Sequence, residues 1–230
     1  LKRLRRDSDP HQRAHRHLIR AEEETLRIHR LLEHLSLMTQ LEVDPDWLGV
    51  REQPLLPVLR HWFEGIPDDR RQRLSIAWGG LSSADLVRID ANALAIVLDQ
   101  LIENAIQHGA DAGQILMSIG CPGHGNSDSY TLQISSSGFG ETVGRTTLDA
   151  WLLPFVRSPG RRSETNAEGA GLGLAIVDRL VQAWGGSLQL DQRSDPDEPS
   201  LTVTSVTLTM PFIAKPLPSA VQGDEGKDPV

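Results

Sequence analysis

Three polar side chains recur at four-residue spacing in one apolar stretch of the chain. Gln100, Asn104 and His108 share one face of the helix that the pattern at 91–108 predicts. An amide beside an apolar surface is costly without a partner, and a metal ion bound to phosphates can be that partner. Mg²⁺ prefers hard oxygen ligands, and a neutral amide oxygen does not compete with phosphate charge. An exposed polar stripe on an ordinary amphipathic helix is the alternative explanation.

A second chemical signal is a run of alternating glycines. Gly169, Gly171 and Gly173 come at the start of an apolar helix expected at 171–184. Glycines let the backbone approach phosphate oxygens, and a helix N-terminus attracts anions. The run does not follow a strand, as a dinucleotide-binding loop would, and it lacks the Gly-Lys-Ser/Thr of a P-loop. A flexible hinge is the alternative.

Two further segments carry weaker signals. The segment Ser136-Ser137-Gly138-Phe139-Gly140 follows an alternating strand and by itself indicates a turn. The segment Trp151-Leu152-Leu153-Pro154-Phe155-Val156-Arg157 is an apolar cluster inside a polar, loop-rich stretch of about 35 residues. Loops of that length in compact domains are typical of lids and binding loops, and the apolar cluster is expected to anchor this one.

The elements expected to position these segments alternate between strands and helices. The chain predicts a short helix near 55–64, strands near 73–78 and 86–89, a helix over 91–108 capped by Asp90, strands near 114–119 and 130–135, a helix over 171–184 stopped by Gly185-Gly186, and strands near 187–192 and 201–209. The tail after Pro211 is expected to be disordered.

An amphipathic helix over 18–42 precedes this pattern and ends before Asp44-Pro45. Its apolar stripe, widened by Leu31 and Met38, steps by threes and fours through Leu18, Ala21, Thr25, Ile28, Leu32, Leu35 and Thr39. The near-heptad spacing favours an intermolecular helix bundle over the alternative, a core helix of a single domain.

Composition excludes several classes of protein. Lys and Arg total 23 against 31 for Asp and Glu, so the net charge is −8. This excludes a broad basic surface for nucleic acid but permits a local anion pocket. A single Cys excludes a disulfide framework and a thiolate zinc site. No apolar run approaches the roughly 20 residues of a membrane span, so we expect no membrane segment in this chain.

The order of the four segments resembles that of the ATP-binding domain of sensor histidine kinases, over roughly residues 55–210. The helix with Asn104 looks like the family's N box, the run ending at Gly173 its second glycine box, and Leu153-Pro154-Phe155-Val156-Arg157 its F box. The 18–42 helix is similar to the second helix of the dimerisation and phosphotransfer hairpin. The resemblance implies an α+β fold, a Bergerat-type sandwich of a mixed sheet with helices on one face, behind a coiled-coil-like helix.

The same resemblance implies the domains and the site. Residues 1–44 would be part of the hairpin, 45–213 the ATP-binding catalytic domain and 214–230 a disordered tail. ATP and Mg²⁺ would bind between the long helix and the lid, with Asn104 holding the metal. Catalytic roles fall to Asn104, Gln100, His108 and Arg157, nucleotide contacts to Asn104, Ser136, Gly138, Gly140, Gly169, Gly171, Gly173 and Leu174, and added positive charge to Arg161 and Arg162.

The implied function is transfer of the ATP γ-phosphoryl group to a histidine of the chain's own dimer, for relay to a response regulator receiver domain. The dimer would form through the N-terminal helices, in the cytoplasm, with room for a membrane-anchored sensor upstream of Leu1. A degenerate kinase-like dimerisation or docking module with weak or no ATP binding is the alternative. A gyrase- or chaperone-like ATPase is a third, disfavoured because Gln100 stands where those families usually carry a general-base Glu.

Two positions depart from the family pattern. Ser136 stands where the family has an Asp that accepts a hydrogen bond from the adenine amino group. Losing a charge-assisted hydrogen bond costs about 1.5–3 kcal/mol. The acceptor His, followed by an acidic residue and an Arg-Thr-Pro-like turn, is expected upstream of Leu1. A solvated helix face is expected for His11, His15, His17, His29 and His34.

Overall fold

The computed structural model describes residues 10–44, 47–110, 113–120, 129–156 and 170–211. The helices are α1 (Pro10–Val43), α2 (Leu55–Gly65), α3 (Asp68–Arg71), α4 (Ala91–His108), α5 (Arg145–Ala150) and α6 (Gly173–Ala183). The strands are β1 (Arg51–Pro54), β2 (Leu74–Ala77), β3 (Leu86–Ile89), β4 (Ile115–Gly120), β5 (Ser129–Phe139), β6 (Ser187–Ser194) and β7 (Leu201–Pro211).

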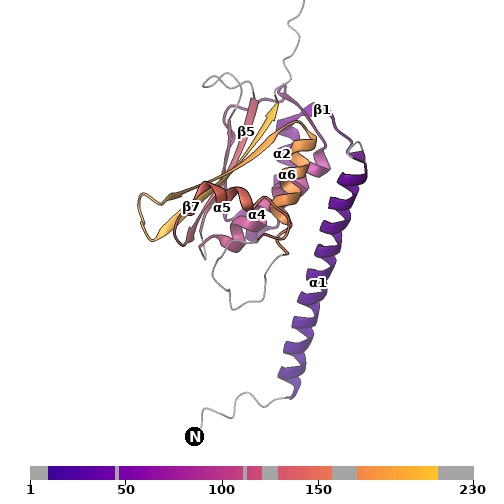
Figure 1. Ribbon diagram of the computed structural model, residues 1–230, viewed down its shortest axis with the longest axis vertical. Coiled ribbons are helices and arrows are strands. Elements are labelled where there is room, and N and C mark those ends of the chain that lie inside the picture. Colours follow the sequence, from indigo (N-terminus) through magenta and orange to yellow (C-terminus); the bar gives the residue numbers. More distant parts are fainter. Residues whose placement is uncertain (1–9, 45–46, 111–112, 121–128, 157–169, 212–230) are drawn as a thin grey trace, which may run out of the picture.

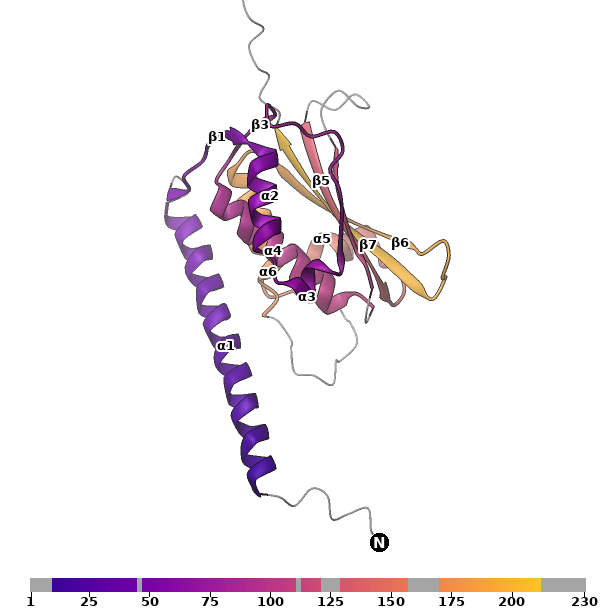
Figure 2. The ribbon, with the colours of Figure 1, turned by 180° about the vertical axis from the view of Figure 1, so that it is seen from behind.

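The main sheet has five strands in the order β2-β4-β5-β7-β6. Strands β2 and β4 run parallel, and the other neighbours are antiparallel, so the sheet is mixed. Strands β1 and β3 form a separate antiparallel pair. Helices α2, α4 and α6 lie between the main sheet and α1 (Figure 2). The predicted α+β sandwich of a mixed sheet with helices on one face is confirmed.

The alternation of β5 shows which face of the sheet the helices cover. Tyr130, Leu132 and Ile134 are buried in the core, and the residues between them are only partly buried. Side chains two residues apart point to the same face of a strand, so these three face the helices. Ser136 and Gly138 continue the same series, and they therefore lie on the helix-covered face at the end of β5.

Helix α4 is fixed at its start by one carboxylate and along its length by apolar packing. The Asp90 side chain accepts a hydrogen bond from the Ala93 N–H through Oδ1 (2.9 Å) and from the Gly49 N–H through Oδ2 (2.8 Å). The first bond is the predicted cap. Leu94 and Leu98 are fully buried against the core. The predicted helix boundaries, 91–108, are confirmed.

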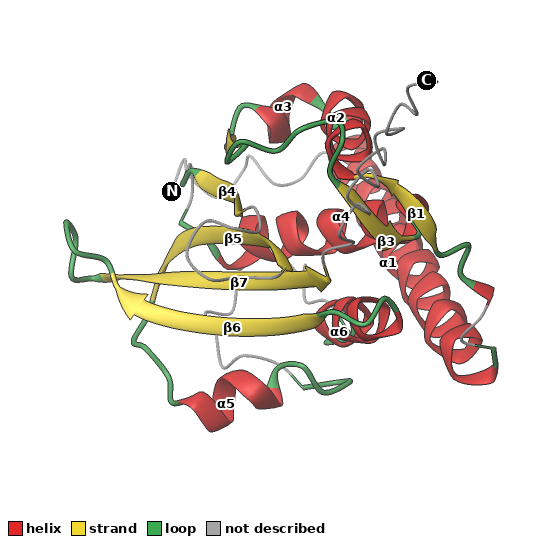
Figure 3. Ribbon diagram, turned by 90° about the horizontal axis from the view of Figure 1, so that it is seen from above, coloured by secondary structure: helices red, strands yellow, loops and turns green. Residues whose placement is uncertain are grey.

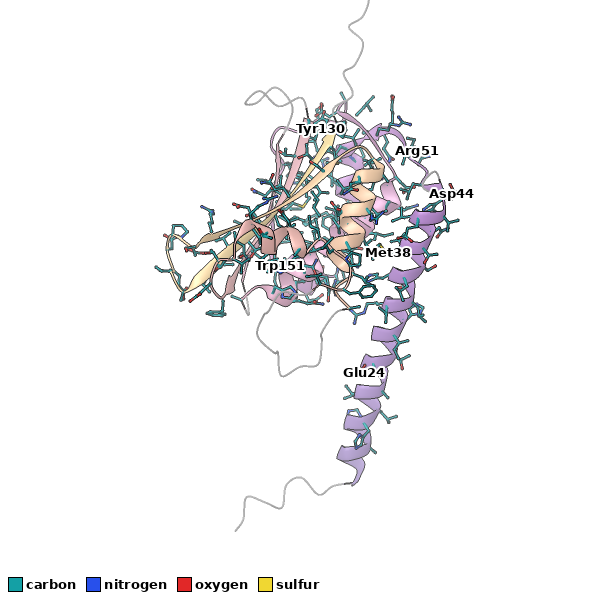
Figure 4. The ribbon with its side chains drawn as sticks, viewed as in Figure 1. Glu24, Met38, Asp44, Arg51, Tyr130 and Trp151 are labelled. Atoms are coloured by element: carbon teal, nitrogen blue, oxygen red, sulfur yellow. The ribbon has the colours of Figure 1, made fainter. Side chains whose placement is uncertain are left out.

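Helix α1 extends well beyond the rest of the molecule (Figure 1). It begins at Pro10, earlier than the predicted start near residue 18, because proline suits the first helical position. Figure 4 shows Met38 at the contact between α1 and the domain, and Glu24 on the half of the helix that projects past it. None of the helices in the described ranges is both long and apolar enough to cross a membrane.

Several elements differ from the sequence-based expectations. The loop-rich stretch contains α5, which lies beside the edge strand β6 (Figure 3). Strand β5 runs on to Phe139, so the expected turn at Ser136-Ser137-Gly138 is wrong. Those residues pair with Thr204, Val203 and Thr202 of β7, and this distant partner extends the strand. Strand β1 and helix α3 were also not predicted.

Candidate functional site

The start of α6 lies against two amides of α4. A Cβ placed on Gly173 would lie 2.8 Å from Gln100 Oε1 and 3.7 Å from Asn104 Nδ2. The missing side chain of Gly173 leaves room for the Gln100 amide beside the helix N-terminus. The first N–H groups of a helix have no partner within it and attract anions. The polar face of α4 at Gln100 and Asn104 therefore meets the start of α6 at Gly173.

The Asn104 amide is buried and incompletely bonded. Its Nδ2 has no hydrogen-bond partner among the described residues. A buried unpaired donor is costly, and the cost is relieved when a ligand oxygen accepts from it. The amide oxygen is at the same time a hard ligand of the kind that Mg²⁺ takes. Within the described residues no group of three His, Cys, Asp or Glu side chains forms a metal site. The site thus fits a metal that arrives with phosphates.

The other end of α4 meets β5 backbone to backbone. A Cβ on Gly138 would overlap the His108 carbonyl oxygen, and the Ala110 N–H donates to the Ser137 carbonyl at 2.7 Å. Ser136 precedes Gly138 by two residues and faces the same side. Desolvation by the surrounding protein lowers the pKa of His108, although the residue is exposed to solvent. The helix end and Gly138 thus form a second border of the site.

The second glycine run also meets the apolar segment that resembles the F box. The Phe155 N–H donates to the Gly171 carbonyl at 2.8 Å. Gly171 has φ of 71°, and a Cβ there would lie 2.8 Å from the Val156 carbonyl oxygen. Phe155 itself has φ of 65°, a conformation that costs a non-glycine residue about 1–2 kcal/mol. The Phe155–Gly171 hydrogen bond thus joins the two segments at a point where both residues have a positive φ.

Two of the remaining predicted site residues, Gly140 and Leu174, lie within the described part of the chain. Gly140 has φ of 143° and no heavy atom within 4 Å of a Cβ position. Leu174 is partly buried against the core. Arg157, Gly169, Arg161 and Arg162 lie outside the described residues.

One residue of the site was assigned wrongly from the sequence. His34 of α1 is partly buried, and its Nε2 lies 3.0 Å from Gln100 Nε2. An amide nitrogen only donates, so the bond requires an unprotonated His34 Nε2. Desolvation lowers the pKa of His34, Glu33 raises it and Arg30 lowers it. The expectation of a solvated face for His34 is wrong, because the contact is tertiary and no local pattern announces it.

A polar row on the sheet was also not anticipated. Thr204 of β7 lies between Ser136 of β5 and Gln192 of β6 in the strand register. Gln192 Nε2 donates to Thr204 Oγ1 at 2.9 Å, and Gln192 Oε1 accepts from the Val143 N–H at 3.1 Å. The sequence predicts a strand that contains Thr204, but only the pairing of β7 with β5 and β6 shows that Ser136 and Gln192 lie on either side of it.

The model of the histidine kinase-, DNA gyrase B-, and HSP90-like ATPase family matches residues 89–214, more than half of the chain. The chain belongs to this ATPase family. The match spans α4, the sheet strands β4 to β7 and α6, which are the elements that form the site.

The curated relatives of this family member are sensor histidine kinases. ZraS of Escherichia coli is 28% identical over 149 residues, 64% of this chain and 29% of that protein. WalK of Bacillus subtilis is 29% identical over 126 residues, 55% of this chain and 19% of that protein. The chain therefore spans less than a third of either. The predicted resemblance to sensor histidine kinases is confirmed.

Solved structures of histidine kinases resemble the fold of this chain. The solved structure of the Acinetobacter baumannii histidine kinase AdeS matches with a TM-score of 0.58 and 21% identity, covering 84% of each chain. This likeness supports the fold.

Proposed function

We propose that this chain binds Mg-ATP and transfers its γ-phosphoryl group to a histidine of its own dimer, for relay to a response regulator receiver domain. The observation that carries the proposal is the contact of Gly173 with the Gln100 and Asn104 amides. It joins a helix N-terminus, a close backbone approach and an unpaired buried amide in one place. Each of the three favours phosphate, and membership of the ATPase family favours ATP.

The residues take distinct roles in this proposal. When bound, Mg²⁺ neutralises charge on the transferring phosphoryl group. Asn104 would hold the metal through its oxygen and donate to phosphate through Nδ2. Gln100 is neutral and cannot take a proton from water, so it positions phosphate without promoting hydrolysis. Arg157, Gly169 and the other glycines keep the roles that the resemblance implies.

The dimer would use the face of α1 that points away from the domain. Leu31 and Met38 pack against the core, whereas Leu18, Ile28 and Leu32 are exposed at 68%, 56% and 59%. An apolar seam of this length on a projecting helix suits a second copy of the same helix. Residues 1–44 and 45–213 keep their proposed roles as hairpin part and catalytic domain.

Calorimetric titration of Mg-ADP into the purified chain tests the nucleotide site. We expect saturable binding in the micromolar range, with Asn104→Ala weakening it at least about tenfold because a buried ligand contact is lost. Gln107→Ala is the matched control, since Gln107 is exposed on the same helix and bonds only to Glu103. Absence of heat at millimolar nucleotide would contradict the proposal.

A degenerate docking module remains the second candidate, favoured by the neutral Ser136 and by the exposed seam of α1. Both functions need a dimer, so sedimentation of Leu32→Glu tests the dimer without choosing between them. A Leu32→Glu variant that sediments like the parent chain would argue against the seam. The nucleotide titration separates the two functions.

A further inference from the structure

The polar row on the sheet lies where a bound nucleotide would place its base. Gly173 and Asn104 mark the phosphate end of the site, and Gly138 marks the other end of the same face of α4. Ser136 and Thr204 form the sheet surface beside Gly138. A base extending from phosphates at the first end therefore meets the row at the second.

The row presents two hydroxyl groups, those of Ser136 and Thr204, and a hydroxyl group can either donate or accept a hydrogen bond. Gln192 is held at both ends of its amide, by the Val143 N–H and by Thr204. Since Thr204 Oγ1 accepts from Gln192, the hydroxyl hydrogen of Thr204 remains available for donation. Ser136 makes no side-chain hydrogen bond to another described residue, and a serine hydroxyl rotates to donate or to accept. Either hydroxyl can thus meet a donor or an acceptor on the base.

Two carboxylates lie close to this row in the chain, and neither belongs to it. Asp191 directly precedes Gln192 in β6, so its side chain points to the opposite face of the sheet. Asp195, just after β6, is bonded elsewhere. Asp195 accepts from the Ser137 hydroxyl at 3.0 Å and from the N–H groups of Asp197 and Glu198. Ser137 follows Ser136 directly, so its side chain points to the opposite face of the sheet. Within the described part of the chain, the hydrogen bonds of the row involve no carboxylate.

We propose that this row makes the site tolerant at the 6-position of a purine, so that 6-oxo and 6-amino nucleotides bind with similar affinity. The inference rests on the proposed function, because the base reaches the row only when phosphates occupy the Gly173 end. A carboxylate only accepts hydrogen bonds, so it selects an amino group and repels a carbonyl oxygen. The hydroxyls of Ser136 and Thr204 impose no such choice.

Calorimetry of the whole chain with Mg-ADP and with Mg-IDP tests the inference. Inosine differs from adenosine only in its 6-oxo group and in the proton on N1, which isolates the proposed contact. We expect dissociation constants within about fivefold of each other for the parent chain. Ser136→Asp should shift their ratio at least about tenfold toward ADP, since the carboxylate restores a fixed acceptor.

Ser135→Asp is the matched control. It adds the same charge one residue away, but Ser135 points to the opposite face, where its hydroxyl bonds to Ser205 at 2.8 Å. The ADP-to-IDP ratio of this variant should equal that of the parent chain. A ratio that shifts as much as in Ser136→Asp would mean that charge alone is responsible, and would overturn the inference.

The parent ratio decides the matter even if Ser136→Asp fails to fold, as circular dichroism would show. A preference of the parent chain for ADP of a hundredfold or more overturns the inference and leaves the proposed function standing. A folded Ser136→Asp variant with an unchanged ratio overturns it as well. Binding of neither nucleotide at millimolar concentration overturns the proposed function, and the inference with it.

Discussion

The two borders of the site use glycine in different ways. Gly138 brings the backbone of β5 against the backbone of α4, at the His108 carbonyl. Gly173 brings the backbone of α6 against the end of a flexible side chain, the Gln100 amide. One contact is therefore rigid and the other adjustable. The Gly138 border is fixed by the fold, whereas the Gly173 border depends on an amide that can turn.

The adjustable border is also the one connected to α1. Gln100 contacts Gly173 through its oxygen and His34 through its nitrogen. Arg30 of α1 and Arg70, just before the end of α3, both reach Glu103 on the next face of α4, at 3.8 and 3.0 Å. These two ion pairs are partly exposed and contribute little energy by themselves. Together with the His34 contact, the Arg30–Glu103 pair joins α1 to α4 close to Gln100.

The largest expected effect comes from adding a methyl group at the rigid border. Gly138→Ala would force the His108 backbone away from β5, and overpacking of this kind costs about 1–3 kcal/mol. We expect a lower urea midpoint together with a loss of nucleotide binding. Gly144→Ala is the control, because no heavy atom lies within 4 Å of its Cβ position. An unchanged midpoint for Gly138→Ala would show that this border is not rigid.

A smaller and more selective effect is expected at the adjustable border. In Gly173→Ala the new methyl would lie 2.8 Å from Gln100 Oε1, and the amide can turn away without moving the backbone. Stability should therefore stay near that of the parent chain, while Mg-ADP affinity falls about tenfold as one polar contact is lost. Thermal unfolding and calorimetry on one preparation separate the two readouts. A loss of stability as large as in Gly138→Ala would erase the distinction between the borders.

The smallest effect concerns the pH dependence of the contact between α1 and α4. The pKa values of His34 and His108 are both lowered by desolvation, so the unfolded chain binds more protons near pH 6. The free energy of unfolding should thus rise with pH up to about 6.5, the ordinary histidine value, and fall as acid protonates these rings. His34→Gln should reduce this slope in urea titrations at several pH values. A slope as steep in His34→Gln as in the parent chain would contradict the assignment to His34.

Local patterns predicted the elements that carry most of the site. The Asp90 cap and the apolar spacing of α4 gave its boundaries, and Gly185-Gly186 gave the end of α6. The sequence also placed Gln100 and Asn104 on one face of the helix. These features depend on residues close together in the chain, so spacing alone reveals them.

The features that escaped prediction depend on distant partners. Residues 136–139 look like a turn until β7 is paired with them. Helix α5 buries only Leu148, which is too little apolar surface to produce a periodic signal. His34 lies in a heptad-like run in which no local pattern marks it as buried, and only the packing of α1 on the domain brings it to Gln100. Gln192 and Thr204 are hydrogen-bonded only because β6 and β7 pair with each other.

Two neighbouring residues of α1, His34 and Leu35, have different surroundings. His34 bonds to Gln100, while Leu35, the next residue, is 38% exposed. A molecule that binds against Leu35 would therefore contact α1 one residue away from the side chain that bonds to Gln100. No loop separates the two positions, because both belong to the same helix.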